Sequence, residues 1–301
     1  MEKLNATGYL APEDLVVPML EELGKPLETH ERLVLVKGIA KPCAWAQNIW
    51  LAPYRFEFSS IADAAKQLRA VQRNWALYSS QLHRRAKLIQ EQLPHVSAKP
   101  IEFPGKLPSS PLGSWTLIAP NTILCSAECS SPVPNGELRF VENRSDPPSR
   151  AYLKLWEALT LCGRYPQAGE RCLDAGASPG GWTWVLAQLG AEVWSVDRST
   201  LAPELMRNTR VHFQKGDAFS ILPSGEQTFD WVFSDVICYP EKLLEWIELW
   251  LRQEQPPNMI CTLKFQGEKP YGVIKRFRNI PGGRVLHLFH NKHELTWIYV
   301  R

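Results

Sequence analysis

The order of hydrophobic and polar positions between residues 172 and 197 predicts a strand, a tight turn, a helix and a second strand. The first apolar run has the length of a buried strand, and three glycines crowd the turn behind it. A helical pattern then runs to Gly190, and the second strand ends at Asp197. The predicted elements are the strand 172–177, the helix 182–189 and the strand 192–196. Together they form a βαβ unit, whose first turn is a binding site for adenosine-bearing cofactors.

The same alternation continues to the end of the chain, where two final strands are joined by a turn at 291–293. The predicted strands are 211–214, 229–236, 259–265, 284–290 and 294–300, and the predicted helices are 203–207, 241–253 and 271–278. Strands that alternate with helices predict a parallel sheet with helices on both faces. A terminal hairpin that adds one antiparallel strand is typical of methyltransferases. The predicted fold class is therefore α/β, with a Rossmann-like methyltransferase sheet.

Residues 1 to about 140 show a weaker pattern of short strands and helical stretches. The predicted helices are 12–23, 61–93 with a break near Ser79 and Ser80, and 151–162, and the predicted strands are 33–39, 54–58, 115–125 and 138–141. Residues 97–114 are rich in Pro, Gly and Ser, which predicts a connector, and a second break follows at 144–150. We therefore predict a smaller N-terminal α+β domain over residues 1–145 and the methyltransferase-like domain over residues 146–301.

The composition supports folded domains and says little about function. Apolar residues make up 45% of the 301 positions, and a net charge of +3 does not by itself indicate a nucleic-acid partner. Seven cysteines without framework spacing indicate reduced thiols and a cytoplasmic protein. The N-terminus has no signal-peptide pattern and no apolar run reaches membrane length, so no membrane partner is expected. Cys125 and Cys129 lack a second Cys/His pair, so no metal site is predicted.

The helical stretch 61–93 is rich in basic residues. It contains Lys66, Arg69, Arg73, His83, Arg84, Arg85 and Lys87. One interpretation is an ordinary solvated helix face, and the other is a phosphate-contacting surface with Trp75 and Tyr78 near it. Most of the twelve Trp are expected in cores, while a minority could be platforms on which bases stack. The sequence leaves both interpretations of the basic stretch open.

The turn of the βαβ unit differs from a dinucleotide-binding turn. It reads Asp174-Ala-Gly176-Ala-Ser178-Pro179-Gly180-Gly181 and leads into Trp182. A pyrophosphate must approach the helix N-terminus closely, so a dinucleotide site needs three fingerprint glycines, whereas Ser and Pro stand within this turn. An acid two residues before the first glycine is the one seen in S-adenosylmethionine (SAM) sites, where it orders the turn and meets the methionine ammonium. A nicotinamide-dinucleotide (NAD) site or a plain βαβ turn is the alternative.

Two further acids suit the rest of an adenosine cofactor. Asp197, at the end of the second strand, can hold both ribose hydroxyls because a carboxylate accepts two hydrogen bonds. Asp217 follows the third strand, from which it can reach the adenine amino group. These positions favour SAM as the cofactor.

Charged residues also stand at the ends of the last parallel strands, where ligands of an open sheet bind. Asp235 ends the fourth strand, and Lys264 lies near the end of the fifth between two apolar neighbours. A lysine in a buried strand is costly unless it is paired or functional. It could form only a structural salt bridge with Asp235, or both residues could share one pocket with Lys154 and Glu294.

The segments SRAYLKLWEA, DAGASPGGWT, FSDV, LKF and HELTWIYVR resemble successive motifs of the FtsJ-type (RrmJ-like) ribose 2′-O-methyltransferases. The resemblance covers residues 149–301 and extends to the bacterial enzymes that modify large-subunit ribosomal RNA. It implies SAM as cofactor, RNA as partner, and a catalytic tetrad of Lys154, Asp235, Lys264 and Glu294. It also implies SAM contacts at Ser178 to Gly181, Asp197, Asp217 and Asp235. The segment WTLIAP…ELRFVENRSDPPSR resembles the end of a THUMP-type RNA-binding domain.

The tetrad has a physical interpretation. A ribose hydroxyl is too weak an acid to ionise at neutral pH, so its proton must leave as the methyl is transferred. A lysine can take that proton only if its pKa falls from about 10.4, through desolvation or a neighbouring cation. Lys264 is therefore the expected base and Lys154 the neighbouring cation. Asp235 would orient the amine of Lys264, and Glu294 would hold Lys154.

The predicted function is SAM-dependent methylation of an RNA ribose 2′-hydroxyl, with large-subunit ribosomal RNA as the expected substrate and transfer RNA as the alternative. Two other classes compete with it. An NAD-dependent oxidoreductase would need a third fingerprint glycine near Pro179. A SAM- or RNA-binding module without catalysis is disfavoured by the complete tetrad.

Overall fold

The computed structural model describes residues 2–223, 228–265 and 271–301, and the chain divides into two compact units. The first unit consists of residues 1–101 and 107–139, and the second of residues 102–106 and 140–301. The short segment 102–106 thus belongs to the second unit, although the chain on both sides of it belongs to the first. Each unit has its own sheets and its own buried core.

The second unit is built on a seven-stranded sheet in the order β12-β11-β10-β13-β14-β16-β15. Its strands are β10 (Arg171–Ala175), β11 (Glu192–Asp197), β12 (Val211–Lys215), β13 (Trp231–Ser234), β14 (Asn258–Leu263), β15 (Gly283–Leu286) and β16 (Leu295–Tyr299). The strands from β12 to β14 pair in parallel, whereas β16 runs antiparallel between β14 and β15. The prediction of a Rossmann-like sheet with a terminal antiparallel hairpin is confirmed.

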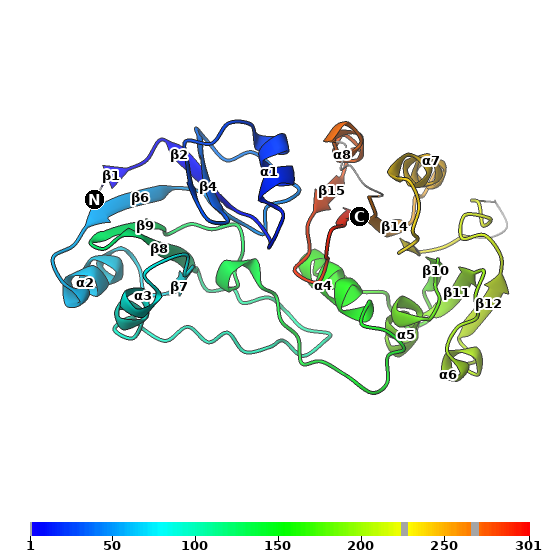
Figure 1. Cartoon of the computed structure of the whole chain (residues 1–301). Coiled ribbons are helices and arrows are strands. Elements are labelled where there is room, and N and C mark those ends of the chain that lie inside the picture. The colour runs from blue at the N-terminus through cyan, green and yellow to red at the C-terminus, as the bar shows by residue number, and fades with distance from the viewer. Residues whose placement is uncertain (1, 224–227, 266–270) are drawn as a thin grey trace. The chain divides into compact units, whose positions relative to one another are not determined.

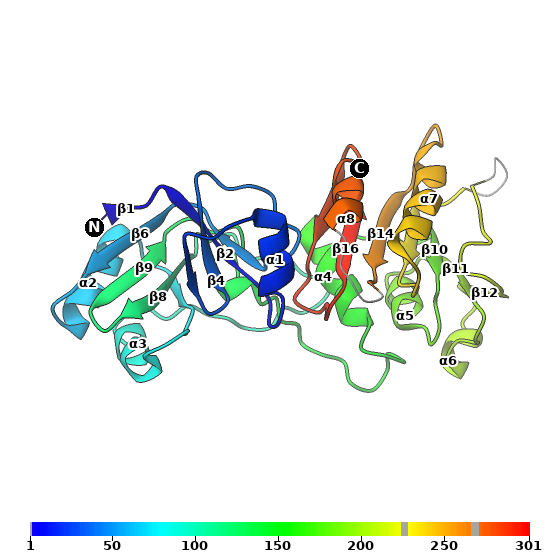
Figure 2. The same cartoon turned by 45° about the horizontal axis from the view of Figure 1, so that its top comes forward.

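Helices cover both faces of this sheet, as Figures 1 and 2 show. On one face lie α4 (Tyr152–Cys162), α5 (Gly181–Gln188) and α6 (Pro203–Met206), and on the other lie α7 (Pro240–Leu251) and α8 (Tyr271–Arg278). In α7 the apolar positions Leu243, Leu244 and Ile247 are all buried, as their helical spacing predicts. All six residues of β14 are buried, which is expected of a strand covered on both faces.

The strand order creates a crevice between β10 and β13. The chain runs from β10 outwards to β11 and β12, and then returns to β13 on the other side of β10. Loops at the carboxyl ends of the strands separate at such a reversal and leave room for a ligand. The glycine-rich turn 176–181 follows β10 and Asp235 follows β13, so the topology brings the predicted cofactor turn and the tetrad acid to one edge of the sheet.

The first unit is α+β, as predicted, and contains a five-stranded sheet (β1-β6-β9-β8-β7) and a four-stranded sheet (β3-β4-β2-β5). Its strands are β1 (Glu2–Lys3), β2 (Ala6–Leu10), β3 (Glu28–His30), β4 (Leu33–Lys37), β5 (Asn48–Trp50), β6 (Pro53–Glu57), β7 (Trp75–Leu77), β8 (Gly113–Ala119) and β9 (Thr122–Ser126). Its helices are α1 (Val16–Leu23), α2 (Ile61–Val71), α3 (His83–Gln90) and the short 3-10 helix η1 (Pro134–Gly136). A core that includes Phe56, Trp75 and Trp115 joins α2 and α3 to the five-stranded sheet.

The prediction of a mostly helical stretch over 61–93 is wrong between α2 and α3, where β7 pairs in parallel with β8. Trp75 is fully buried, and its indole N–H donates to the carbonyl oxygens of Leu68 (3.0 Å) and Gln72 (3.1 Å) at the end of α2. The buried indole stabilises residues 75–77 as a strand of the sheet, because it fills the core and its N–H finds acceptors there.

Two predicted strands of the first unit also differ from the structure. The strand 115–125 is a hairpin, in which β8 and β9 are joined by a turn at Pro120 and Asn121, both of which are turn-forming residues. Residues 138–141 form no strand, although the backbone N–H of Ile101 donates to Arg139 O over 2.8 Å. The short apolar run thus makes a single backbone pairing with a distant segment and does not extend into a strand.

Among the described residues, no helix is long and apolar enough to cross a membrane. Within the same ranges, no group of three or more His, Cys, Asp or Glu side chains could hold a metal ion. All seven cysteines are free thiols. Cys129 Sγ lies 3.7 Å from Ser126 O, and burial raises the pKa of this thiol to about 11.

Candidate active site

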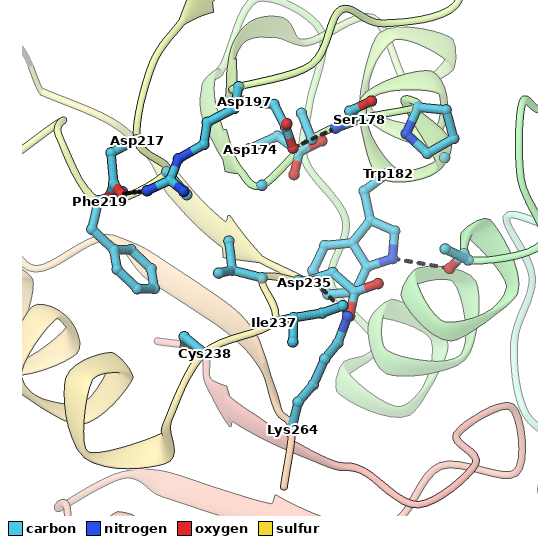
Figure 3. A pocket seen from close by; sticks show the side chains of 18 of the residues that line it. Asp174, Ser178, Trp182, Asp197, Asp217, Phe219, Asp235, Ile237, Cys238 and Lys264 are labelled. Atoms are coloured by element: carbon cyan, nitrogen blue, oxygen red, sulfur yellow. Dashed lines mark hydrogen bonds and ion pairs between the residues drawn. The ribbon is translucent and has the colours of Figure 1, made fainter. Parts of the chain in front are cut away.

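A pocket of about 470 Å³ opens at the carboxyl ends of β10, β11, β13 and β14 in the second unit. Most of the residues predicted to bind the cofactor line it: Asp174, Gly176, Ser178, Pro179, Gly181, Trp182, Asp197, Asp217 and Asp235. Lys264 lines the same pocket, and Figure 3 shows it on the side away from Asp197 and Asp217. Gly180 is not among the lining residues; a Cβ there would lie 2.2 Å from Leu205, so this glycine allows the turn to pack on α6.

The turn after β10 is held by the strand beside it. Ser178 N–H donates to Asp197 Oδ2 over 3.0 Å, and Gly176 N–H donates to Val196 O over 2.8 Å. Gly176 has φ +83°, and a Cβ at this position would lie 2.2 Å from Val236 Cγ2. Only glycine fits here, because both the backbone conformation and the contact with the loop after β13 exclude a side chain.

Asp174 is the most deeply buried acid of the pocket, with 1% of its surface exposed. Its Oδ2 accepts a hydrogen bond of 2.6 Å from Thr183 Oγ1, while its buried Oδ1 has no hydrogen-bond partner among the described residues. Burial, reinforced by the nearby charges of Asp235 and Asp197, raises the pKa of this carboxyl to about 7. An unpartnered carboxylate oxygen facing a pocket fits a cationic ammonium group, as the predicted contact with methionine requires.

Asp197 and Asp217 supply acceptors farther along the pocket. Asp197 Oδ1 accepts from Ser199 N–H over 2.8 Å, which fixes its carboxylate at the end of β11. Asp217 accepts from Phe219 N–H (3.0 Å) and from Arg198 Nη2 (2.7 Å), and these hydrogen bonds lower its pKa. Backbone donors thus orient both carboxylates, as residues that bind hydroxyl and amino groups should be.

The four tetrad residues lie together. Lys154 Nζ is 2.9 and 2.8 Å from the two carboxylate oxygens of Asp235, and 3.4 Å from Glu294 Oε1. Lys264 Nζ lies 3.0 Å from Asp235 Oδ1 and donates to the backbone oxygen of Asp235 over 2.6 Å. The cluster of two lysines and two carboxylates therefore combines residues from α4, from the loops after β13 and β14, and from the loop directly before β16.

The two lysines of this cluster have different surroundings. The side chain of Lys264 is 22% exposed and lines the pocket, whereas that of Lys154 is 10% exposed and is not among the residues that line it. Asp235 bridges them, so the salt bridge with Lys264 foreseen from the sequence exists as one part of a larger cluster. Lys264 therefore supplies the amine that this cluster exposes to the pocket.

Two polar residues beside the site were not predicted. Ser149 lines the pocket, and its buried Oγ finds no hydrogen-bond partner among the described residues. Glu157, one turn after Lys154 on α4, is 3% exposed and accepts hydrogen bonds from the backbone N–H groups of Phe289 (2.7 Å) and His290 (3.0 Å). The signal for Glu157 was present in the sequence, since a carboxylate inside an otherwise apolar helix needs buried partners.

Comparisons with known proteins match the part of the chain that contains this pocket. Residues 147–250 match the family of FtsJ-like methyltransferases. The relatives "Ribosomal RNA large subunit methyltransferase M" (RlmM) of Halorhodospira halophila and of Xylella fastidiosa are 35% and 34% identical to this chain. These matches cover 51% and 50% of this chain and 47% and 46% of the relatives, so the chain spans about half the length of the curated relatives it matches.

Among solved structures, fibrillarin of Aeropyrum pernix in complex with S-adenosyl-L-methionine is 19% identical. The match covers 49% of this chain and 75% of that chain, with a TM-score of 0.34. At that score the likeness supports no conclusion about the chain. The strand order, the glycine turn and the pocket define the second unit as a Rossmann-like methyltransferase domain. The family match identifies it more closely, as an FtsJ-like methyltransferase domain.

Proposed function

We propose that this chain is a SAM-dependent RNA methyltransferase that modifies a ribose 2′-hydroxyl of large-subunit ribosomal RNA. The observation that supports this best is the cluster of Lys154, Asp235, Lys264 and Glu294 beside the cofactor-type pocket of an FtsJ-like domain. The names of the RlmM relatives favour ribosomal RNA as the substrate. The free thiols fit a reducing compartment, and we propose the cytoplasm.

The residues that would hold SAM follow from the geometry of the pocket. The unpartnered Oδ1 of Asp174 would take the methionine ammonium, Asp197 the ribose hydroxyls and Asp217 the adenine amino group. When bound, SAM supplies an electrophilic methyl group on a sulfonium. The turn 176–181 would orient that group toward the side of the pocket where Lys264 lies.

In the proposed mechanism the neutral amine of Lys264 takes the proton of the ribose hydroxyl. The hydroxyl oxygen would receive the methyl group that bound SAM supplies, and the sulfonium would leave as a neutral thioether that keeps the electron pair of the broken bond. Asp235 would hold the amine of Lys264 through the contacts at 3.0 and 2.6 Å, and Lys154 would hold the Asp235 carboxylate through its contacts at 2.9 and 2.8 Å. Glu294, 3.4 Å from Lys154, would keep that cation in place.

We further propose that the first unit binds the RNA, with α2 and α3 as the contact surface. The segment 61–93 contains six Lys and Arg against two acids, which gives it a net charge of +4, more than that of the whole chain (+3). None of the six makes an ion pair among the described residues: Lys66, Arg69, Arg73, Arg84, Arg85 and Lys87. Cations without an ion pair, on two neighbouring helices and in the segment between them, suit a phosphate backbone. Trp75 and Tyr78 are buried, so this surface would act through charge alone.

Methyl transfer onto RNA tests the proposed function. Purified protein, tritiated SAM and an unmodified large-subunit ribosomal RNA transcript should give label that nucleoside mapping finds on a ribose. A transfer RNA transcript should remain unlabelled. Label on a base nitrogen or on protein, with none on ribose, would refute the proposal.

A further inference from the structure

The loop between β13 and α7, which begins at the tetrad acid Asp235, exposes two large apolar side chains. Ile237 is 74% exposed and Tyr239 is 62% exposed, and they follow Asp235 by two and four residues. Ile237 lines the pocket, and Figure 3 shows it next to Asp235 and Lys264. Exposed apolar groups at the mouth of a site are candidates for contact with a ligand, because water solvates them poorly.

Tyr239 differs from the other aromatic residues of the chain. Among the side chains described in residues 2–223, 228–265 and 272–301, it is the one exposed ring of a Phe, Tyr or Trp. All twelve Trp are buried or partly buried, so none offers the open platform that the sequence allowed for. The tryptophans therefore pack within the protein, whereas the ring of Tyr239 is open to a ligand.

The loop is anchored on both sides of these two residues. Val236 lies against Gly176 of the cofactor turn so closely that a Cβ on the glycine would be 2.2 Å from Val236 Cγ2. On the other side, Pro240 is buried at the start of α7, where its ring fixes the backbone. Tyr239 itself has extended backbone angles, φ −65° and ψ 137°. The backbone that holds the Tyr239 ring is thus anchored by Val236 on one side and by Pro240 on the other.

We infer that Tyr239, two residues after the pocket-lining Ile237, is a platform on which a base of the acceptor RNA stacks. This inference rests on the proposed function and adds the residue that would hold the acceptor nucleotide. Proteins that recognise single-stranded RNA splay out a base and stack it on an aromatic ring. A base on Tyr239 would hold the adjoining ribose near Lys264, at the acceptor side of the pocket. Cofactor binding would not need this ring, since Tyr239 is not among the residues lining the pocket.

The test compares Tyr239→Ala with Tyr239→Phe, and uses Met206→Ala as the matched control, because Met206 is 44% exposed on α6 and does not line the pocket. Methyl transfer to an unmodified large-subunit ribosomal RNA transcript is measured together with SAM affinity and melting temperature. Base stacking predicts that Tyr239→Ala lowers kcat/KM for RNA on the order of tenfold or more. Tyr239→Phe and Met206→Ala should stay near the wild-type value. SAM affinity and melting temperature should be unchanged in all three.

Two results would overturn the inference. A Tyr239→Ala variant with unchanged kcat/KM would show that no base stacks there, while an active wild type would leave the proposed function intact. A loss of SAM affinity in the same variant would assign Tyr239 to the cofactor. A failure of the proposed function itself looks different, because the wild-type protein would then transfer no methyl to ribose.

Discussion

At the scale of single residues, the protonation of Asp174 makes cofactor binding in the pocket depend on pH. Its carboxyl is buried beside two other acids, and its pKa is raised to about 7. The protein without ligand therefore holds a proton on Asp174 below that pH. A cationic ammonium at the unpartnered oxygen needs the ionised carboxylate, so binding must release this proton.

The first prediction is that SAM affinity falls as pH falls below about 7. The dissociation constant should rise up to about tenfold per pH unit between pH 7 and 5.5, and stay nearly constant from pH 7 to 8. Isothermal titration calorimetry across this range measures it. Asp174→Asn should bind SAM more weakly at pH 8 and lose the pH dependence. A wild-type affinity that does not change with pH would contradict the assigned ammonium contact.

The second prediction concerns Gly176, for which the chain offers a matched control. Gly176 and Gly169 have nearly the same backbone angle, φ +83° and φ +82°, but a Cβ meets Val236 only at Gly176 and open space at Gly169. Gly169→Ala should cost about 1–2 kcal/mol of stability from backbone conformation alone. Gly176→Ala should cost more and weaken SAM binding at least about tenfold, because the β-branched Val236 cannot turn away. Chemical denaturation and calorimetry measure both effects, and equal behaviour of the two variants would disprove the steric argument.

At the scale of elements, α4 connects two parts of the site. Lys154 on this helix reaches Asp235 and Glu294, and Glu157 one turn later binds the loop between β15 and β16 at Phe289 and His290. Glu294 stands at the end of that same loop, directly before β16. The helix therefore fixes the loop that presents Glu294 to Lys154.

The third prediction is that Glu157→Gln destabilises the second unit. One carboxylate oxygen that accepts a backbone N–H becomes an amide donor, and the loss of such a charged hydrogen bond costs about 1.5–3 kcal/mol. Urea denaturation measures this free energy. The control is Glu245→Gln, at an exposed position of α7, which should change stability by less than about 0.5 kcal/mol. An unchanged midpoint for Glu157→Gln would show that the loop does not depend on α4.

The sequence predicted the elements of the second unit well because their hydrophobic patterns are long and regular. The run at β14 and the stripe of α7 correspond to fully buried strand and helix positions. The first unit was harder, since strands of three residues such as β3, β5 and β7 are shorter than any period can define. The site residues that belong to the FtsJ-type motifs could be predicted from the sequence. The partners of Glu157 could not, because Phe289 and His290 lie in a loop far away along the chain.

At the scale of the whole molecule, the chain joins an FtsJ-like methyltransferase domain to a unit with a basic helix pair. The family predicted from the motifs is confirmed for residues 147–250. The division at 145 and 146 and the THUMP-like nature of the first unit stay predictions. Because phosphate contacts make RNA affinity salt-dependent, the role of the first unit can be measured separately from catalysis.

The fourth prediction is that Arg84, Arg85 and Lys87 contact RNA phosphates. Changing all three to Glu should weaken binding of a large-subunit ribosomal RNA transcript and reduce the slope of log affinity against log salt by about two to three. The control changes Lys3, Lys25 and Lys37 to Glu, which alters the charge equally at exposed positions elsewhere in the unit. Filter binding at several salt concentrations gives both slopes. Equal losses in the two variants would indicate an unspecific charge effect and contradict the assigned surface.

The central claim is that the amine of Lys264 takes the proton of a ribose hydroxyl during methyl transfer. Single-turnover transfer by Lys264→Met, with SAM affinity measured on the same sample, tests it most directly. Loss of a general base predicts a rate about 10²- to 10⁴-fold lower with SAM binding retained. A Lys264→Met variant that transfers methyl to ribose at nearly the wild-type rate would contradict the account.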